Sequence, residues 1–272
     1  MIEPASAAAE LLAAYEARRP MTPLSSRDPS FDLERAYSIE REFVRRRRAA
    51  GHETAGLKVG YASKAVWRAL KLKTLVWAHM YDDTVRLAEA NQASLSVSHM
   101  TSPKIEPEIV FKLRSAVHAG AADAAAALAA VEWIALGFEI IDSVYPDWKF
   151  RPEDFVAAFG LHRALVVGSP LGLDERNRAA LAEALPAFTV SLSRDGETIA
   201  SGSGKNSLGS PAACLVELAS AVAASPDVAS LGRGSLVSSG TLTESQPMGS
   251  DQTWRAEISG LDLPPLTLRS AA

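Results

Sequence analysis

The stretch KIEPEIVFKL, residues 104–113, has the apolar pattern of a buried β-strand, but it carries two glutamates. In a strand the side chains at positions i and i+2 lie on the same face, so we expect Glu106 and Glu108 to point the same way, about 7 Å apart. Pro107 between them lacks an N–H group, which suits an edge or irregular position beside a site. Burying two carboxylates on one face is costly unless another group offsets their charge. The strand therefore indicates a site that supplies positive charge.

A third acid, Glu139, lies in another apolar stretch, LGFEIIDSVYPDW, residues 136–148. Three carboxylates on apolar strands are difficult to keep ionised without a cation. Ligands that are all oxygen favour Mg²⁺ or Mn²⁺ over Zn²⁺, which prefers His and Cys. From these residues alone an alternative stays open, in which one or more of the acids faces solvent on a half-exposed strand.

The composition is that of an ordinary globular protein. Of the 272 residues 47% are hydrophobic, and the net charge of −4 gives no reason to expect a nucleic acid as a partner. No window approaches the roughly 18 continuous apolar residues of a membrane span, and neither a signal peptide nor a membrane partner is expected. The single cysteine, Cys214, lies on an apolar helical pattern and fits a reducing cytoplasm, where we expect the protein to reside.

The pattern of elements predicts an α+β fold. Helices are expected over 6–20 and 28–51, a strand over 56–61, a short helix over 63–73, and short strands over much of 75–113. Further along, a helix starting at 123 should run into a strand at 134–141, and another strand should end at Gly168. A hairpin with its turn at Asp195-Gly196, a helix over 210–224 and several short strands complete the chain. Residues 1–55 are predicted to form a helical cap and residues 56–272 a β-rich catalytic domain.

Six segments, in this order, carry a family resemblance: GLKVGYASKAVWRAL (56–70), LVWAHMYDD (75–83), SPKIEPEIVFKL (102–113), EIIDSVYPDWKF (139–150), GSGKNSLGSPAACLVELA (202–219) and SSGTLTESQPMGSD (238–251). Together they resemble the fumarylacetoacetate hydrolase superfamily, and most closely its branch of 2-oxopent-4-enoate hydratases and 4-oxalocrotonate decarboxylases. The similarity runs from about residue 30 to the C-terminus. The resemblance implies a twisted mixed β-roll of the fumarylacetoacetate hydrolase C-terminal type with an N-terminal helical cap.

The resemblance also implies the roles of several residues. Glu106, Glu108 and Glu139 match the family's ligands of Mg²⁺ or Mn²⁺, to which a 2-oxo acid substrate would bind through its carboxylate and keto oxygens. Lys58 matches the family's lysine near the substrate. Lys149 matches another family lysine, which could contact the substrate or pair with a nearby aspartate.

Two further residues, Thr241 and Gly240, match the segment that receives the carboxylate of the 2-oxo acid. Gly240 would let the backbone approach the substrate closely.

The sequence departs from the family in two places. Val76 stands where hydratases carry a proposed acid/base Asp, and Val76-Trp77-Ala78 is more similar to the corresponding segment of the decarboxylases. The segment AAFGLH, residues 157–162, replaces a polar one, which makes His162 a candidate proton shuttle. Trp77 and His79 are candidate substrate-binding residues. Residues 62–73 lack the histidine that hydrolases of the superfamily use to activate water.

These features predict a lyase that acts on a small unsaturated 2-oxo acid from aromatic catabolism. The reaction would be hydration or decarboxylation through a metal-bound dienolate. A C–C bond hydrolase of an acylpyruvate or maleylpyruvate is the alternative, and a non-catalytic paralogue that serves as the partner of a lyase is a second one. Family members are usually homo-oligomers, so we expect one here, possibly in complex with a pathway enzyme.

Overall fold

Three helices form the N-terminal cap in the computed structural model, which describes residues 2–117, 120, 123–225 and 231–272. They are α1 (Pro4–Glu16), α2 (Leu24–Arg27) and α3 (Leu33–Ala49). The side chains of Glu3 and Asp32 accept hydrogen bonds from free N–H groups at the starts of α1 and α3, as N-cap residues do. The cap buries Leu11, Tyr15 and Phe43 against α6 (Pro152–Ala157) and the turn that follows it.

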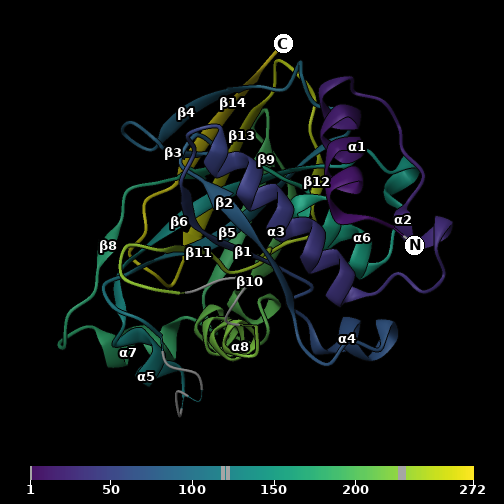
Figure 1. Ribbon diagram of the computed structural model, residues 1–272. Coiled ribbons are helices and arrows are strands. Elements are labelled where there is room, and N and C mark those ends of the chain that lie inside the picture. Colours follow the sequence, from purple (N-terminus) through teal and green to yellow (C-terminus); the bar gives the residue numbers. More distant parts are fainter. Residues whose placement is uncertain (1, 118–119, 121–122, 226–230) are drawn as a thin grey trace.

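A mixed sheet that curls on itself forms the centre of the molecule (Figure 1). Along its main path the strands are β2 (Val76–Tyr81), β1 (Thr54–Gly60), β11 (Leu236–Ser238), β5 (Pro103–Leu113), β6 (Val131–Asp142), β7 (His162–Val167) and β3 (Val85–Leu87). β1 pairs with β11, and β3 with β7, in parallel, and the other neighbours on this path are antiparallel. The two end strands, β2 and β3, are joined by the short turn 82–84, so the sheet closes toward a roll.

The inner face of this roll carries a small apolar cluster, to which β2, β5, β6, β7 and β11 contribute: Met80, Val110, Ala135, Leu165, Val167 and Leu236. A side chain two residues from one of these on the same strand also faces inward. This parity decides which polar residues can enter the roll.

A second sheet has the order β10 (Glu197–Ser203), β9 (Thr189–Arg194), β13 (Thr253–Ser259), β14 (Leu266–Ala271) and β4 (Gln92–Ser96). The hairpin of β9 and β10 turns at Asp195 and Gly196, which both have positive φ, as the sequence predicts. Three further helices, α5 (Ala124–Leu128), α7 (Arg178–Ala184) and α8 (Pro211–Ala223), lie together at the lower end of the view in Figure 1. α8 buries Cys214 in the main core.

The fold class is confirmed, and small differences occur at element ends. The helix predicted from residue 123 ends at Leu128, so that β6 begins at Val131, three residues before the predicted start. The helix predicted over 63–73 is α4 (Lys64–Leu70), which ends because Lys71 adopts a left-handed conformation. The boundary at residue 55 stays a prediction. Within the described ranges, none of the helices is long and apolar enough to cross a membrane.

Candidate metal centre

Three glutamates meet on the inner face of the roll. The register of β5 and β6 places Glu106 directly opposite Glu139, and Glu108 lies two residues further along β5 on the same face. A carboxylate oxygen from each of the three lies within 4.8 Å of the others. Glu108 and Glu139 are buried and Glu106 is half-buried. The structure therefore brings together the three acids that the sequence singles out.

The hydrogen bonding of Glu108 tests whether this cluster suits a cation. Its Oε2 accepts hydrogen bonds from the Ser238 hydroxyl at 2.5 Å and from the Gly240 N–H at 2.9 Å. Its Oε1 is buried and, within the part of the chain that the structure describes, has no hydrogen-bond partner. A buried carboxylate oxygen without a donor is costly, and a hard divalent cation would satisfy it. The three carboxylates thus fit Mg²⁺ or Mn²⁺.

Lys58 on β1 supplies a buried positive charge next to these acids. Its Nζ lies 3.0 Å from Glu139 Oε2 and donates a hydrogen bond to the Gly160 carbonyl oxygen at 3.0 Å. Gly160 has a positive φ of 63°, and a Cβ there would lie 2.8 Å from the Cδ of Lys58. Only glycine allows the turn to approach the lysine so closely.

His162 holds the same glutamate from the other side. Its Nδ1 lies 2.9 Å from Glu139 Oε1, and its Nε2 lies 3.0 Å from the Thr84 hydroxyl oxygen. The turn before it is unusual, because Phe159, Gly160 and Leu161 all have positive φ. This left-handed turn places the Gly160 carbonyl oxygen next to Lys58 and the His162 ring next to Glu139.

Burial and charge shift the pKa values of the cluster in different directions. Burial, opposed by Lys58, raises the pKa of Glu106 to about 7. Burial and the neighbouring Glu139 raise the pKa of Glu108 well above its usual range. Burial also acts on Glu139, but Lys58 and the hydrogen bond from His162 outweigh it and hold its pKa below the usual value. Burial lowers the pKa of Lys58, but the three carboxylates outweigh it and raise that pKa overall.

These shifts predict how pH affects the metal-free protein and its response to Mg²⁺. An acid whose pKa is raised by folding contributes stability that is present below its unfolded pKa and is lost as the pH rises through the folded value. Glu106 and Glu108 are of this kind, so the metal-free protein should become less stable between about pH 5 and 8. Cation binding requires ionised carboxylates, so the stabilisation by Mg²⁺ should grow over the same range. Thermal unfolding with Mg²⁺ or with a chelator, measured at each pH, checks both trends.

The control for this pH series is Glu132→Gln, which changes an exposed glutamate on the same strand as Glu139. It should keep both trends. A stabilisation by Mg²⁺ that is constant or that grows toward low pH would contradict the assignment of the three acids.

A cavity of about 300 Å³ lies beside the cluster. Lys58 and Glu106 lie in its wall, and so do Gly240 and Thr241, for which the resemblance implies contact with the substrate. The rest of the lining is largely apolar and aromatic, and includes Val59, Val66, Ile141, Trp148, Phe150, Phe155 and Leu161. A small organic acid could enter here and reach the carboxylate cluster.

The structure does not bring three of the predicted residues to the cluster. Lys149 has a side chain that is 81% exposed, and its Nζ lies 3.2 Å from Asp147, one of the two aspartates considered as its partner. Trp77 and His79 lie on the opposite face of β2 from Ala78, which pairs with Lys58. Trp77 packs on the ring of Tyr37, and His79 Nδ1 lies 2.6 Å from Glu40 on α3.

Sequence reasoning did not single out Ser238 and Phe155. Ser238 donates to Glu108, and the Phe155 ring lies 4.9 Å from Lys58 Nζ. Ser238 belongs to the motif that contains Gly240 and Thr241, so its place in that motif was a usable signal. Phe155 had no comparable signal, because its contact with Lys58 depends on how α6 packs.

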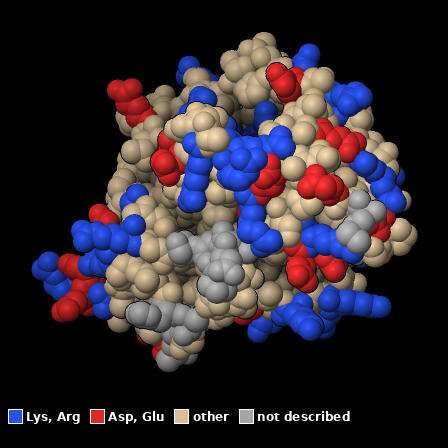
Figure 2. Space-filling view, viewed as in Figure 1, with Lys and Arg blue, Asp and Glu red and all other residues tan. Residues whose placement is uncertain are grey.

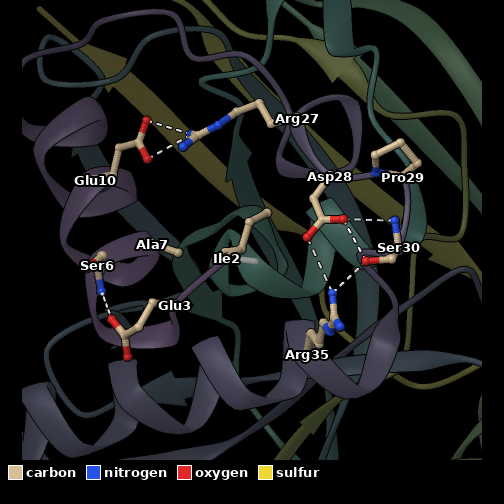
Figure 3. A pocket seen from close by; sticks show the side chains of 10 residues that line it. All are labelled: Ile2, Glu3, Ser6, Ala7, Glu10, Arg27, Asp28, Pro29, Ser30 and Arg35. Atoms are coloured by element: carbon tan, nitrogen blue, oxygen red, sulfur yellow. Dashed lines mark hydrogen bonds and ion pairs between the residues drawn. The ribbon is translucent and has the colours of Figure 1, made fainter.

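A larger hollow lies between α1 and the segment that follows α2, and Figure 3 shows it from close by. Its charged side chains all have partners within the cap, and Glu3 accepts a hydrogen bond from the Ser6 N–H. Glu10 accepts two hydrogen bonds from Arg27, and Asp28 pairs with Arg35. Since these groups satisfy each other, the hollow is a groove of the cap surface, and the metal centre lies elsewhere.

A curled mixed sheet with a helical cap and three clustered glutamates on its inner face is the arrangement that the resemblance to the fumarylacetoacetate hydrolase superfamily implies. The comparisons with known proteins agree. The chain is 30% identical to a 2-hydroxyhexa-2,4-dienoate hydratase of Comamonas testosteroni over 218 residues, 79% of this chain and 78% of the relative. It is also 30% identical to a 4-oxalocrotonate decarboxylase of a Pseudomonas species over 242 residues, 88% of each chain. A search of family models found no match.

The fold was also compared with solved structures. The 4-oxalocrotonate decarboxylase from Pseudomonas putida G7, complexed with magnesium and adipate, superposes with a TM-score of 0.87 over 98% of this chain and 97% of that one. At 22% sequence identity, this likeness shows the fold. The sequence relatives show that the chain belongs to the family of these hydratases and 4-oxalocrotonate decarboxylases, which are enzymes.

Proposed function

We propose that this enzyme is a divalent-metal-dependent lyase of small unsaturated 2-oxo acids in aromatic catabolism. Within that class we favour decarboxylation of a 2-oxo-3-hexenedioate-type substrate over hydration of a 2-oxopent-4-enoate-type substrate. The observation that carries this choice is the lining of the cavity. Apart from the phenol of Tyr61, its only ionisable side chains, among the residues that the structure describes, are Lys58 and Glu106.

Glu106, Glu108 and Glu139 would hold the ion, as Mg²⁺ or Mn²⁺. The structurally similar decarboxylase was solved with magnesium, which supports this choice of ion. When bound, the ion supplies a Lewis acid that draws electrons from a 2-oxo group.

The residues of the chain account for the rest of the site. Lys58 offers a fixed positive charge beside the acids, held by Glu139 and the Gly160 carbonyl. Thr241 and the backbone at Gly240, which line the same cavity, would receive the substrate carboxylate. Most of the wall is apolar, which suits the loss of CO₂ because that step needs no activated water.

Hydration and hydrolysis both require a group that activates water. Val76 lies opposite Gly60, on the same face of the sheet as Lys58, and puts an apolar side chain where hydratases carry an acid. His162 is close to the cluster, but Glu139 and Thr84 occupy both of its ring nitrogens. We therefore propose that His162 positions Glu139, instead of acting as the proton shuttle that the sequence predicts.

The proposal also covers the oligomeric state, the cellular compartment and the partners of the protein. We propose a homo-oligomer in the cytoplasm, where the single, buried Cys214 would stay reduced. Association with a pathway enzyme stays a prediction.

An assay panel separates the reactions. The purified protein is incubated with Mg²⁺ and, in turn, with 2-oxo-3-hexenedioate, 2-hydroxypenta-2,4-dienoate and maleylpyruvate. Ultraviolet absorbance follows loss of the conjugated substrate, and CO₂ release is measured in parallel. We expect turnover of 2-oxo-3-hexenedioate with one CO₂ per molecule consumed, and a chelator should abolish it.

The other outcomes would replace the proposal. Consumption of the dienoate without CO₂ would make the protein a hydratase, and release of pyruvate from maleylpyruvate would make it a hydrolase. Stabilisation by Mg²⁺ without turnover of any of the three would favour a non-catalytic paralogue.

A further inference from the structure

A second cavity, of about 310 Å³, lies between the cap and the central sheet. We call it the cap cavity. Its wall comes from α1, α3, the β2–β3 hairpin, the loop at His99 and the start of β7. Figure 2 shows Lys and Arg side chains gathered beside a hollow near the C-terminal end of α3, at the upper centre of the view. The turn before β7 separates this cavity from the metal centre, because Phe159 lines the cap cavity while Leu161 lines the other one.

The cap cavity has an excess of positive charge. Three arginines line it, Arg47, Arg86 and Arg163, together with a single carboxylate, Asp83. Arg47 forms an ion pair with Asp83, so these two charges cancel. Within the described ranges of the chain, Arg86 and Arg163 have no ion-pair partner. The guanidinium of Arg163 is held over the ring of Tyr15, 5.0 Å from its centroid. Two guanidinium charges thus remain available in the cavity.

Neutral polar groups in the wall add hydrogen-bonding capacity. Tyr81 is 2% exposed, and its hydroxyl is buried with no hydrogen-bond partner in the described part of the chain. A buried hydroxyl without a partner is costly, and a bound acceptor would relieve that cost. His79 is also buried, and Glu40 holds its Nδ1 so that Nε2 stays available. His99 lines the cavity together with Arg86 and Arg163. Burial and the charge of Arg163 lower the pKa of His99, and the nearby Asp142 carboxylate opposes this shift.

We propose that the cap cavity is a binding site for a small oxyanion, a carboxylate or a phosphate, separate from the metal centre. Planar guanidinium groups recognise such anions through paired hydrogen bonds, and the Tyr81 hydroxyl would donate a further one. Behind the wall, the Glu139 carboxylate is paired with the Lys58 ammonium group, which offsets its charge. The volume of the cavity is sufficient for a molecule the size of a small organic acid.

The test measures anion binding with the metal centre silenced. Acetate, succinate and inorganic phosphate are titrated by calorimetry into the wild-type protein with a chelator and into Glu106→Gln. We expect saturable binding of at least one of them in both proteins. Preference for succinate over phosphate would assign a carboxylate ligand, and the reverse would assign a phosphate. Failure of the proposed lyase activity would not affect this result, because neither protein holds a metal in the experiment.

Two variants tie the binding to this cavity. Arg163→Met and Tyr81→Phe should each weaken the affinity at least about tenfold, because each removes a donor to a charged ligand. Arg48→Met is the matched control, since Arg48 follows Arg47 on α3 but does not line the cavity, and it should leave the affinity unchanged. The Tyr81 variant keeps the test decisive if loss of Arg163 impairs folding. The proposal is overturned if none of the three anions binds saturably, or if the folded variants bind as tightly as the wild type.

Discussion

Replacing Glu106 with Gln should abolish the response of the protein to Mg²⁺ and reduce its catalytic activity at least about 10³-fold. A metal that polarises the substrate supplies several kcal/mol of transition-state stabilisation, and each factor of ten in rate corresponds to about 1.4 kcal/mol. Without a metal ion, the substitution should increase the stability of the protein. The change removes a half-buried acid that repels Glu139, so the variant should be more stable than the wild type at pH 8. Thermal unfolding with and without Mg²⁺, together with the assay panel, measures both effects.

The matched control is again Glu132→Gln, which makes the same chemical change at an exposed position of β6. It should keep the full Mg²⁺ response and activity. If Glu106→Gln retained a stabilisation by Mg²⁺ similar to that of the wild type, the cation would bind somewhere other than at the three glutamates.

The sequence was sufficient to predict the face on which two of these acids lie, because the period of a strand is fixed at two residues. Residues 104–113 form β5, and Glu106 and Glu108 point into the roll together. The position of Glu139 depends on the register between β5 and β6, which pairs residues about thirty positions apart. No local pattern contains that register. The apolar stretch around Glu139 indicated a third candidate acid, and the family resemblance supplied its match to the metal ligands.

The positions of Trp77, His79 and His162 also depend on features that no local sequence pattern contains. Lys58 pairs with Ala78, so the alternation of β2 turns Trp77 and His79 to the other face, where they contact Tyr37 and Glu40 of α3. This parity cannot be derived before the pairing of β1 and β2 is known. The orientation of His162 depends on three consecutive residues with positive φ, two of which, Phe159 and Leu161, are residue types that rarely adopt it. Sequence patterns therefore predict His162 as a polar residue near the site, but not its contact with Glu139.

Lys58 should contribute strongly to the stability of the metal-free protein, and less to its stability when Mg²⁺ is bound. Lys58 is 1% exposed and pairs with Glu139, which is fully buried. Removing one partner of a buried ion pair leaves an uncompensated charge and costs about 3–5 kcal/mol. Lys58→Met should therefore lower the free energy of unfolding by that amount in the presence of a chelator. Mg²⁺ should reduce the deficit, because the ion would bring positive charge to the same carboxylate. Urea unfolding in the two conditions measures the difference.

Activity separates this electrostatic role from a direct role in the reaction. If Lys58 also contacts the substrate, as its place in the cavity wall indicates, Lys58→Met should lose activity about 10²-fold or more even when Mg²⁺ has restored its stability. Lys112→Met is the matched control, because Lys112 is a half-buried lysine on β5, two residues beyond the inward-facing Val110 and outside the cavity lining. Lys112→Met should change neither the stability nor the activity appreciably. A Lys58→Met protein that unfolds like the wild type in chelator would show that Glu139 is protonated there, and the charge balance argued for this centre would be wrong.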